Sequence, residues 1–519
     1  MSGLRDAITR RLERFATDDV IGRLWSRDPS LWTDEPDEPE LADRLGWLRV
    51  GAEMQRAVQD LQLFADEVRR DFDRVVLLGM GGSSLAPEVI WRTFGRQSGY
   101  PSFHMLDSTH PRAVAAVEES GRLERTLFIV ASKSGTTLET LSFYRYFWRR
   151  TGGRGSQFVA ITDPDTPLER LAREQGFRRV FLNPPDIGGR YSALSLFGLV
   201  PAALMGVDPG ALLSRGEAMA EQCGADVPPA RNPGAWLGAV MGEAAVAGRN
   251  KLTFLLSPGV ASFGLWVEQL IAESTGKSGK GIVPVVDEPS RRVSTYGADR
   301  LFVTVSLAGE VAGLDERARR LAEAGHPVVR IVLRDAHDLA AEFFCWEFAT
   351  AVAGSVLRVN PFDQPNVAES KQNTKRVLDE GSESEQIAAL RRQDVSSFLE
   401  GVAAGDYVAL LAYANPDAAS ERQMRRLRAA LGDRIPAPVT GGYGPRYLHS
   451  TGQLHKGGPQ VGHFIQVLEP TQSRLGVPGE PYTFDELVAA QAQGDYQALL
   501  GRRRPVLRVS DAGDLLENL

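Results

Sequence analysis

Short apolar runs alternate with helical patterns along most of the chain. Between residues 71 and 200 the runs are RVVLLGM, PSFHMLDS, TLFIVAS, QFVAIT and RVFLN, and helical stretches such as TPLERLAREQG separate several of them. Strands that alternate with helices predict an α/β fold with a parallel sheet. We therefore expect a first α/β unit over residues 71–200.

A second series of apolar runs follows a mostly helical stretch at about residues 192–248. Its members are KLTFLLS, RLFVTVSL, PVVRIVL, DYVALLAY and HFIQVLE, and they predict a second α/β unit. The expected order is a helical N-terminal arm (1–70, broken at TDEPDEPE), the first unit (71–200), a helical connection (201–250), the second unit (251–470) and a C-terminal extension (471–519). The charged stretch DEGSESEQ, near residues 379–386, reads as an exposed connection.

Composition narrows the class of protein. The net charge of −7 argues against a general nucleic-acid binder. Cys223 and Cys345 form neither a disulfide framework nor metal-ligand spacing, which favours a reducing cytoplasm. The N-terminus has no apolar core like that of a signal peptide. We see no window of about 18 uncharged apolar residues, so we expect no membrane partner.

Two loops that follow predicted strands carry candidate chemistry. In GMGGSSLAP (79–87) the glycines let the backbone approach a ligand, and the helix N-terminus beyond them suits an anion. ASKSGTTLET (131–140) repeats this layout with hydroxyls and a lysine. Either loop alone could simply cap a helix. Because open parallel sheets bind ligands beyond the carboxyl ends of their strands, the pair favours a phosphate monoester.

Two charged residues stand in further small-residue motifs. Arg190 follows two glycines in DIGGRYSALS, where it could stabilise a developing oxyanion or form a surface salt bridge. Glu273 ends an apolar helical pattern in AESTGKSGKG, as a candidate base or as a helix-terminal charge.

Downstream, NPFDQPNVAESK contains Gln364 and Lys371, and the lysine alone reads as a solvated helix residue. The Gly-rich loop YLHSTGQLHKGGP contains His449 and His455. A ligand-binding or proton-transfer role is plausible for such histidines, and a structural role suits His455 better than His449.

Together these motifs resemble the glucose-6-phosphate isomerase (phosphoglucose isomerase) family. GMGGSSLAP is similar to its first glycine loop and SKSGTTLET to its sugar-phosphate loop. DIGGRYSALS and GSVLRVNPFDQPNVAESK are similar to its two signatures, and AESTGK to the segment that bears its catalytic glutamate. The resemblance runs from about residue 70 to about residue 470.

The resemblance implies two sugar-isomerase (SIS-type) three-layer α/β sandwich domains with parallel sheets that dimerise around the active site. It also implies reversible conversion of glucose 6-phosphate to fructose 6-phosphate through a cis-enediol, without metal or organic cofactor. Glu273 would be the base, Arg190 and Gly189 would flank the reacting carbons, and Gln364 and Lys371 would contact the substrate. The phosphate side would comprise Gly82, Ser83, Ser132, Lys133, Ser134 and Thr137.

The ring-opening histidine departs from the usual family order. Many members carry it between the glutamate and the lysine signature, but here that interval holds only His326 and His337, in unsuitable settings. LHSTGQLHKGG is similar to the family's histidine segment, so we assign His449, with Gln453 four residues later. This order resembles the isomerase half of bifunctional transaldolase–isomerase chains, although this chain is too short for that fusion.

Two other functions stay open. One is a non-catalytic SIS-type regulator that binds sugar phosphates, and the other is an isomerase that also accepts mannose 6-phosphate.

Overall fold

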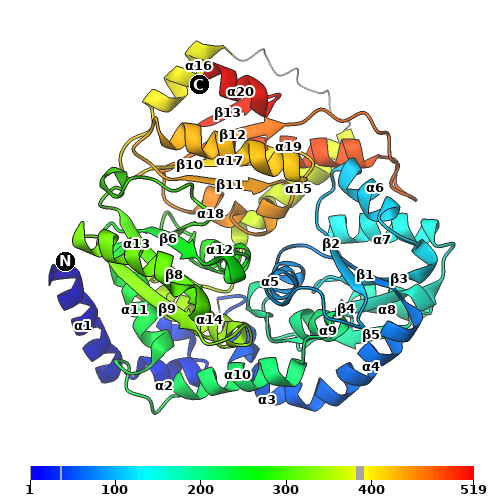
Figure 1. The fold of residues 1–519 in the computed structure, drawn as a ribbon, viewed down its shortest axis with the longest axis horizontal. Helices are drawn as coiled ribbons and strands as arrows, with labels where there is room; N and C mark the ends of the chain where they lie inside the picture. Colours follow the sequence, from blue (N-terminus) through cyan, green and yellow to red (C-terminus); the bar gives the residue numbers. More distant parts are fainter. Residues whose placement is uncertain (1, 36–37, 381–390) are drawn as a thin grey trace.

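The computed structural model describes residues 2–35, 38–380 and 391–519. These residues form three parallel sheets, with strand orders β2-β1-β3-β4-β5, β7-β6-β8-β9 and β11-β10-β12-β13. Figure 1 shows the first sheet in blue and cyan, the second in green and the third in orange and red. The predicted class, α/β layers with parallel sheets, is confirmed.

The first sheet matches the apolar runs predicted between residues 71 and 200. Every residue of β1, β3 and β4 is buried, as expected for parallel strands covered by helices on both faces. The strands are β1 (Arg74–Leu78), β2 (Ser102–Leu106), β3 (Thr126–Ala131), β4 (Phe158–Thr162) and β5 (Arg179–Leu182). Their helices are α5 (Leu85–Phe94), α6 (Pro111–Glu119), α7 (Leu138–Arg150), α8 (Pro167–Glu174) and α9 (Leu196–Met205).

The second and third sheets share the remaining elements. The second comprises β6 (Lys251–Leu256), β7 (Val283–Val285), β8 (Arg300–Leu307) and β9 (Val328–Leu333), with α12 (Phe263–Thr275), α13 (Val311–Glu323) and α14 (Asp338–Leu357). The helices α15 (Pro365–Glu380) and α16 (Arg392–Glu400) precede the third. The third comprises β10 (Tyr407–Tyr413), β11 (Val439–Tyr443), β12 (Gly462–Leu468) and β13 (Val506–Val509), with α17 (Ala418–Gly432), α18 (Gly452–Gly457), α19 (Phe484–Gly501) and α20 (Ala512–Asn518).

The region expected to be one second unit, residues 251–470, is divided further in the structure. The three strands that the hydrophobic pattern does not predict are β7, β11 and β13, and each lies at the edge of its sheet. Edge strands are short: β7 has three residues, and β11 is the glycine-containing VTGGY. Without them β10 and β12 read as a continuation of the second sheet. The C-terminal extension supplies β13 to the third sheet.

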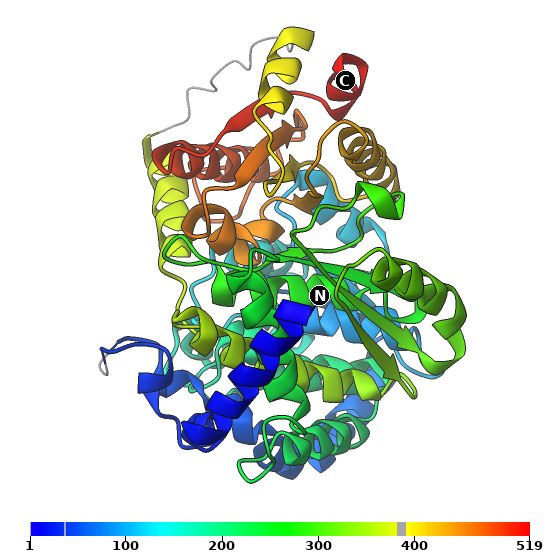
Figure 2. The same ribbon diagram turned by 90° about the vertical axis from the view of Figure 1, so that its left-hand side faces the viewer.

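Helices form the N-terminal arm and the connection, as predicted. The arm contains α1 (Ser2–Thr17), α2 (Val20–Trp25), α3 (Val50–Met54) and α4 (Val58–Asp71), and the connection contains α10 (Pro209–Gln222) and α11 (Pro233–Val246). Arg11 of α1 pairs with Glu243 of α11 at 2.6 Å, and Figure 2 shows α1 lying across the molecule. Part of TDEPDEPE (36–37) and most of DEGSESEQ (from 381) lie outside the described residues.

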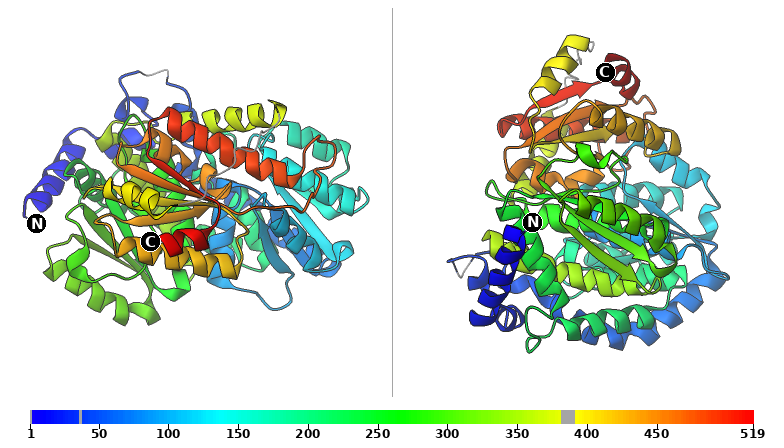
Figure 3. Two further views of the ribbon diagram at one scale, coloured as in Figure 1. Left: turned by 90° about the horizontal axis from the view of Figure 1, so that it is seen from above. Right: turned by 60° about the vertical axis from the view of Figure 1, so that its left-hand side comes forward.

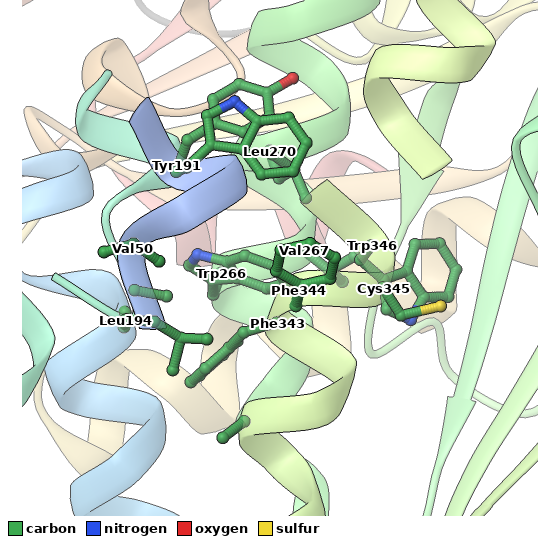
Figure 4. Packing of buried hydrophobic residues seen from close by; sticks show 14 of the residues in the cluster. Val50, Tyr191, Leu194, Trp266, Val267, Leu270, Phe343, Phe344, Cys345 and Trp346 are labelled. Atoms are coloured by element: carbon green, nitrogen blue, oxygen red, sulfur yellow. The ribbon is translucent and has the colours of Figure 1, made fainter. Parts of the chain in front are cut away.

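The core is centred on α14, which packs against α10, α11 and α12. Among the described helices it alone is long and apolar enough to cross a membrane, a length of apolar sequence that we did not expect, but 78% of its most apolar stretch is buried inside the fold. Figure 4 shows Phe343 and Trp346 of this helix packed among Trp266 and Leu270 of α12. Tyr191 lies in the same cluster. This packing fixes both α12 and the turn that carries Arg190.

Candidate active site

Glycines let three loops meet at one point. A Cβ atom on Gly82 would lie 2.1 Å from the carbonyl oxygen of Gly189, so only glycine allows this contact. Gly81 has a φ of +53°, and a Cβ atom there would lie 2.7 Å from the carbonyl oxygen of His449. The loop after β1 therefore touches both the DIGGRYSALS segment and the histidine segment.

Arg190 is a buried cation that faces Glu273. It lies in a 3₁₀ turn, Gly189–Tyr191, and its Nη1 is 3.6 Å from Glu273 Oε1. Its Nε donates to Ser274 Oγ at 2.8 Å, and its Nη2 donates to the carbonyl oxygens of Pro361 and Asp363 at 2.7 and 2.9 Å. These other acceptors are neutral, so the guanidinium charge is directed at the Glu273 carboxylate. The surface salt bridge considered from the sequence does not describe this buried residue.

Glu273 lies in the last turn of α12, and only 4% of its surface is exposed. Its Oε2 accepts a hydrogen bond from Gln269 Nε2 at 3.0 Å. Residues four apart share one helix face, and Gln269 Nε2 also donates to the carbonyl oxygen of His449 at 2.7 Å. One amide thus links the candidate base to the backbone of the candidate histidine.

His449 is paired with a carboxylate that we did not predict from the sequence. Its Nε2 lies 2.9 Å from Glu139 Oε1, which also accepts from Gln491 Nε2 at 2.8 Å. Burial raises the pKa of Glu139, but His449, its hydrogen bond and the charge of Lys371 outweigh burial and hold this pKa below its ordinary value. The ionised carboxylate therefore orients the imidazole.

Glu139 stands in the stretch ASKSGTTLET, in the first turn of α7. An acidic residue at that position is ordinary, because carboxylates favour helix N-termini. Its burial against a histidine 310 residues away leaves no mark in the local pattern.

Gln453, four residues after His449, connects two other segments of the candidate site by hydrogen bonds. The loop predicted around it forms a 3₁₀ turn (Arg446–His449) and α18. Gln453 is fully buried, and its Nε2 donates to the Gly276 carbonyl oxygen at 3.0 Å and to Asn366 Oδ1 at 2.8 Å. The backbone N–H of Asn366 donates to Gln453 Oε1 at 2.9 Å. The glutamine joins the end of α12 to the start of α15.

The hydroxyl-rich loop after β3 is held by its own hydrogen bonds. Ser132 Oγ lies 2.8 Å from Thr137 Oγ1 and accepts from the backbone N–H of Gly135 at 3.1 Å. Ser134, which is exposed, has its Oγ 2.9 Å from Thr136 Oγ1. The hydroxyls are thus gathered in one short loop before any ligand binds.

Lys133 in that loop is already paired. Its ammonium donates to the Asp163 carboxylate and, at 2.9 Å, to the carbonyl oxygen of Pro185. Burial raises the pKa of Asp163, and the hydrogen bond from Lys133 opposes that rise. A phosphate near this lysine would compete with Asp163 for its charge.

Gln364 and Lys371 are exposed at the start and in the middle of the α15 region. Gln364 directly follows Asp363, whose carbonyl oxygen accepts from Arg190. The charge of Lys371 lowers the pKa of Glu139. The two residues therefore border the network of Arg190, Glu273 and His449 without being buried in it.

Lys277, four residues after Glu273, is a second buried group that we did not predict. Its ammonium donates to the carbonyl oxygen of Asn360 and, at 2.7 Å, to that of Asp363, and it pairs with the Asp363 carboxylate at 2.5 Å. Burial and the Arg190 charge lower the pKa of Lys277 to about 7, against the opposing charges of Asp363 and Glu273. In the sequence it stands among small residues that we read as flexible.

Comparison with known proteins agrees with this geometry. The family described as phosphoglucose isomerase matches residues 52–295. The glucose-6-phosphate isomerase of Rubrobacter xylanophilus is 29% identical over 392 residues, which cover 64% of this chain and 89% of that protein. A probable glucose-6-phosphate isomerase of Methanococcus maripaludis is 25% identical over 352 residues, covering 59% and 78%.

In the family match and in these alignments, the chain is similar to the glucose-6-phosphate isomerases. Two solved structures share its fold. A glucose-6-phosphate isomerase from Chlamydia trachomatis aligns with a TM-score of 0.56 at 20% identity, covering 70% of this chain and 78% of that one. A hypothetical protein from Thermus thermophilus aligns with a TM-score of 0.62 at 24% identity, covering 72% and 98%.

The phosphoglucose isomerase match covers only part of the candidate site. Residues 52–295 include the two phosphate loops, Arg190 and Glu273. Gln364, Lys371 and His449 lie beyond its end, so their assignment depends on the motifs and on the contacts described above.

Proposed function

We propose that this phosphoglucose isomerase homologue interconverts glucose 6-phosphate and fructose 6-phosphate, as an aldose–ketose isomerase. The observation that carries the proposal is the buried network in which Gln269 joins the Glu273 carboxylate to the backbone of His449. Arg190 faces the same carboxylate. The similarity to glucose-6-phosphate isomerases supports the same reaction.

The first step is opening of the sugar ring. The imidazole of His449 can carry a proton between the ring oxygen and the anomeric hydroxyl, and the Glu139 carboxylate holds the imidazole in position at 2.9 Å. The motif and this contact support His449 in the role, and the packing of His455 against Tyr407 and Phe464 favours a structural role for that residue.

The second step moves a proton between C2 and C1 through a cis-enediol. The Glu273 carboxylate removes the proton from one carbon and returns it to the other, so a single base suffices. The enediolate carries negative charge, which the Arg190 guanidinium offsets. Gln364 and Lys371 would contact the sugar hydroxyls from α15. No step needs a metal or an organic cofactor.

The phosphate would bind at the loops after β1 and β3. These loops provide backbone N–H groups, hydroxyls and helix N-termini, which suit an anion. The proposed contacts are Gly82, Ser83, Ser132, Lys133, Ser134 and Thr137, with Gly189 beside Gly82.

Three further properties belong to this proposal and rest on the family resemblance. The partner is a small sugar phosphate, without nucleic acid or membrane; the protein works in the cytoplasm; and it forms a homodimer. A non-catalytic regulator is less favoured, because binding alone needs neither the buried base nor the oriented histidine.

A coupled assay with the purified protein tests the function. Fructose 6-phosphate is supplied, and the glucose 6-phosphate formed is oxidised by a dehydrogenase whose reduced nicotinamide product is followed by absorbance. We expect turnover, unchanged by a metal chelator. Binding of fructose 6-phosphate without turnover would favour the regulator, and comparable turnover of mannose 6-phosphate would favour the dual isomerase.

A further inference from the structure

The family resemblance implies an active site at a dimer interface, yet the contacts in this structure join Arg190, Glu273 and His449 within one polypeptide. We infer that the active site is complete in a single chain: His449 serves the Glu273 of its own polypeptide, and a second copy contributes no catalytic group. This inference rests on the proposed function, and it holds whether the protein is a monomer or a dimer.

A buried charge cluster anchors the histidine segment to the first sheet. Arg446, three residues before His449, has its Nη2 2.9 Å from Glu88 Oε2 and its Nε 2.7 Å from Asp107 Oδ2. Glu88 belongs to α5 and Asp107 follows β2, and each is about 5% exposed. Two carboxylates buried this deeply need their cation, since an uncompensated buried charge is strongly destabilising.

A second set of contacts fixes the backbone of His449 against the second sheet and the first glycine loop. Gln269 of α12 donates to its carbonyl oxygen at 2.7 Å. Gly81 packs so closely on that oxygen that a Cβ atom there would approach to 2.7 Å. Because Gln269 Nε2 also donates to Glu273 Oε2 at 3.0 Å, this amide sets the position of the histidine backbone relative to Glu273.

The side chain of His449 and the helix that follows it complete the anchorage. The imidazole contacts Glu139 of α7 across 310 residues of sequence, and Gln453 binds Gly276 and Asn366 across 177 and 87 residues. The segment is thus held from the first sheet, from α12 and from α15, all in the same chain.

The third sheet explains how the chain achieves this. It follows Lys371 in the sequence and lies over the other two sheets, as the view from above in Figure 3 shows. Residues 446–457 lie between β11 and β12 in the sequence, and α18 within this segment packs against α12 and α15. The third sheet therefore brings to the site a histidine that lies after Lys371 in the sequence.

Mixing two inactive variants tests the inference. Chains carrying Glu273→Gln and chains carrying His449→Ala are given different affinity tags, co-expressed and purified on both tags to isolate mixed oligomers. If each site is built within one chain, every site in the mixture keeps one defect and activity stays at the level of the single variants. If the histidine came from the partner, half of the sites would be intact, and recovery to about half the wild-type activity would overturn the inference.

Two controls accompany the mixture. Wild-type chains mixed with Glu273→Gln chains should give half the wild-type activity per chain, which shows that mixing is harmless. If no mixed oligomer can be isolated, full activity of the wild-type protein at concentrations where it is monomeric supports the inference, and activity that appears only with dimerisation and is restored by complementation contradicts it.

A measurement without turnover separates this inference from the proposed function. Wild-type chains with ¹⁵N-labelled histidine are refolded with an excess of unlabelled Glu139→Gln chains. The His449 imidazole signal should keep its wild-type position, because its own chain supplies Glu139. A shift to the position seen in pure Glu139→Gln protein would overturn the inference, whereas absence of isomerase activity in the wild type would overturn only the proposed function.

Discussion

The loop at residues 131–140 and the segment at residues 446–457 both bring side chains to the candidate site, but different forces hold them. In the loop, Ser132 bonds to Gly135 and Thr137, three and five residues away. In the segment, Arg446 and His449 bond to partners more than 300 residues away. The hydroxyls of the loop are held locally, whereas the segment, with its partner Glu139 at the end of that loop, takes its place only from the assembled fold.

This difference separates binding from chemistry. Changes in the local loop should weaken phosphate binding and leave the reacting groups in place. Changes at the long-range contacts of Arg446 and Glu139 should displace the His449 side chain and lower the free energy of unfolding. Substitution of Glu273, which α12 holds between the two regions, should give the loss of kcat against which the other variants are compared.

The largest effect is expected from Glu273→Gln. The amide preserves the shape but cannot accept the C2 proton, so kcat should fall by about 10²–10⁴-fold, the usual contribution of a general base, while KM changes little. The coupled assay measures both constants. Retention of more than about a tenth of the activity would sink the assignment of Glu273.

Arg446→Met should destabilise the whole protein. Removing the cation leaves the buried Asp107 carboxylate without a charged partner, which costs about 3–5 kcal/mol in comparable sites, whereas Glu88 keeps its contact with Arg92 at 2.6 Å. Urea unfolding measures the change in the free energy of unfolding. Arg425→Met is the matched control: Arg425 is exposed and pairs with exposed Asp287, so its loss should cost at most about 1 kcal/mol. Equal effects in the two variants would contradict the anchor.

His449→Ala should slow cyclic substrate more than open-chain substrate. In the proposed mechanism the histidine acts at the ring oxygen, whereas proton transfer between C2 and C1 is assigned to Glu273. Turnover of fructose 6-phosphate is compared with proton exchange at C1 in an analogue that cannot cyclise. Equal losses would show that His449 is not specific to opening, and no loss in either would leave it a structural residue.

Glu139→Gln should lower the free energy of unfolding at neutral pH, because the variant lacks the stabilising carboxylate. Because the folded pKa of Glu139 lies below the ordinary value of 4.5, its ionisation stabilises the fold above that pH, and this contribution is lost as the pH falls through the folded pKa. The difference in unfolding free energy between wild type and variant should therefore shrink below pH 4.5. A difference that does not depend on pH would argue against an ionised Glu139.

The smallest effect is expected in the local loop. Ser132→Ala with Lys133→Ala should raise KM several-fold with a smaller change in kcat, because phosphate contacts are largely shared by ground and transition states. Lys133 also neutralises Asp163, so the single variant Ser132→Ala reports phosphate binding with less disturbance of the fold. A crystal soaked with fructose 6-phosphate locates the phosphate directly, and density elsewhere would end this assignment.

The features that could be predicted from the sequence are those that local contacts hold in place. Buried parallel strands such as β1 and β3 are continuous apolar runs, and the loops after them carry their own glycines and capping hydroxyls. Arg190 and Glu273 stand in short motifs, and the structure brings them within 3.6 Å of each other. Features whose cause lies within some ten residues were therefore predictable.

Edge strands and unexpected partners were not predictable for a physical reason. The edge strands β7 (VPV), β11 (VTGGY) and β13 (VLRV) are too short or too rich in glycine to stand out as apolar runs, because their place in a sheet comes from a neighbouring strand. Glu139 and Lys277 carry no signal of burial in their local sequence, and both are buried by segments distant in sequence.

The sequence by itself determined the α/β class and pointed to the two candidate phosphate loops and to the arginine, glutamate and histidine candidates, because these depend on local periodicity and on residue types in short motifs. The tertiary structure alone decided the third sheet, the pairing of His449 with Glu139 and the Arg446 cluster. The last two of these features depend on contacts across more than 300 residues, and the third sheet depends on β11 and β13 pairing with β10 and β12. Burial of charge is settled only when the distant segments that surround it have packed together.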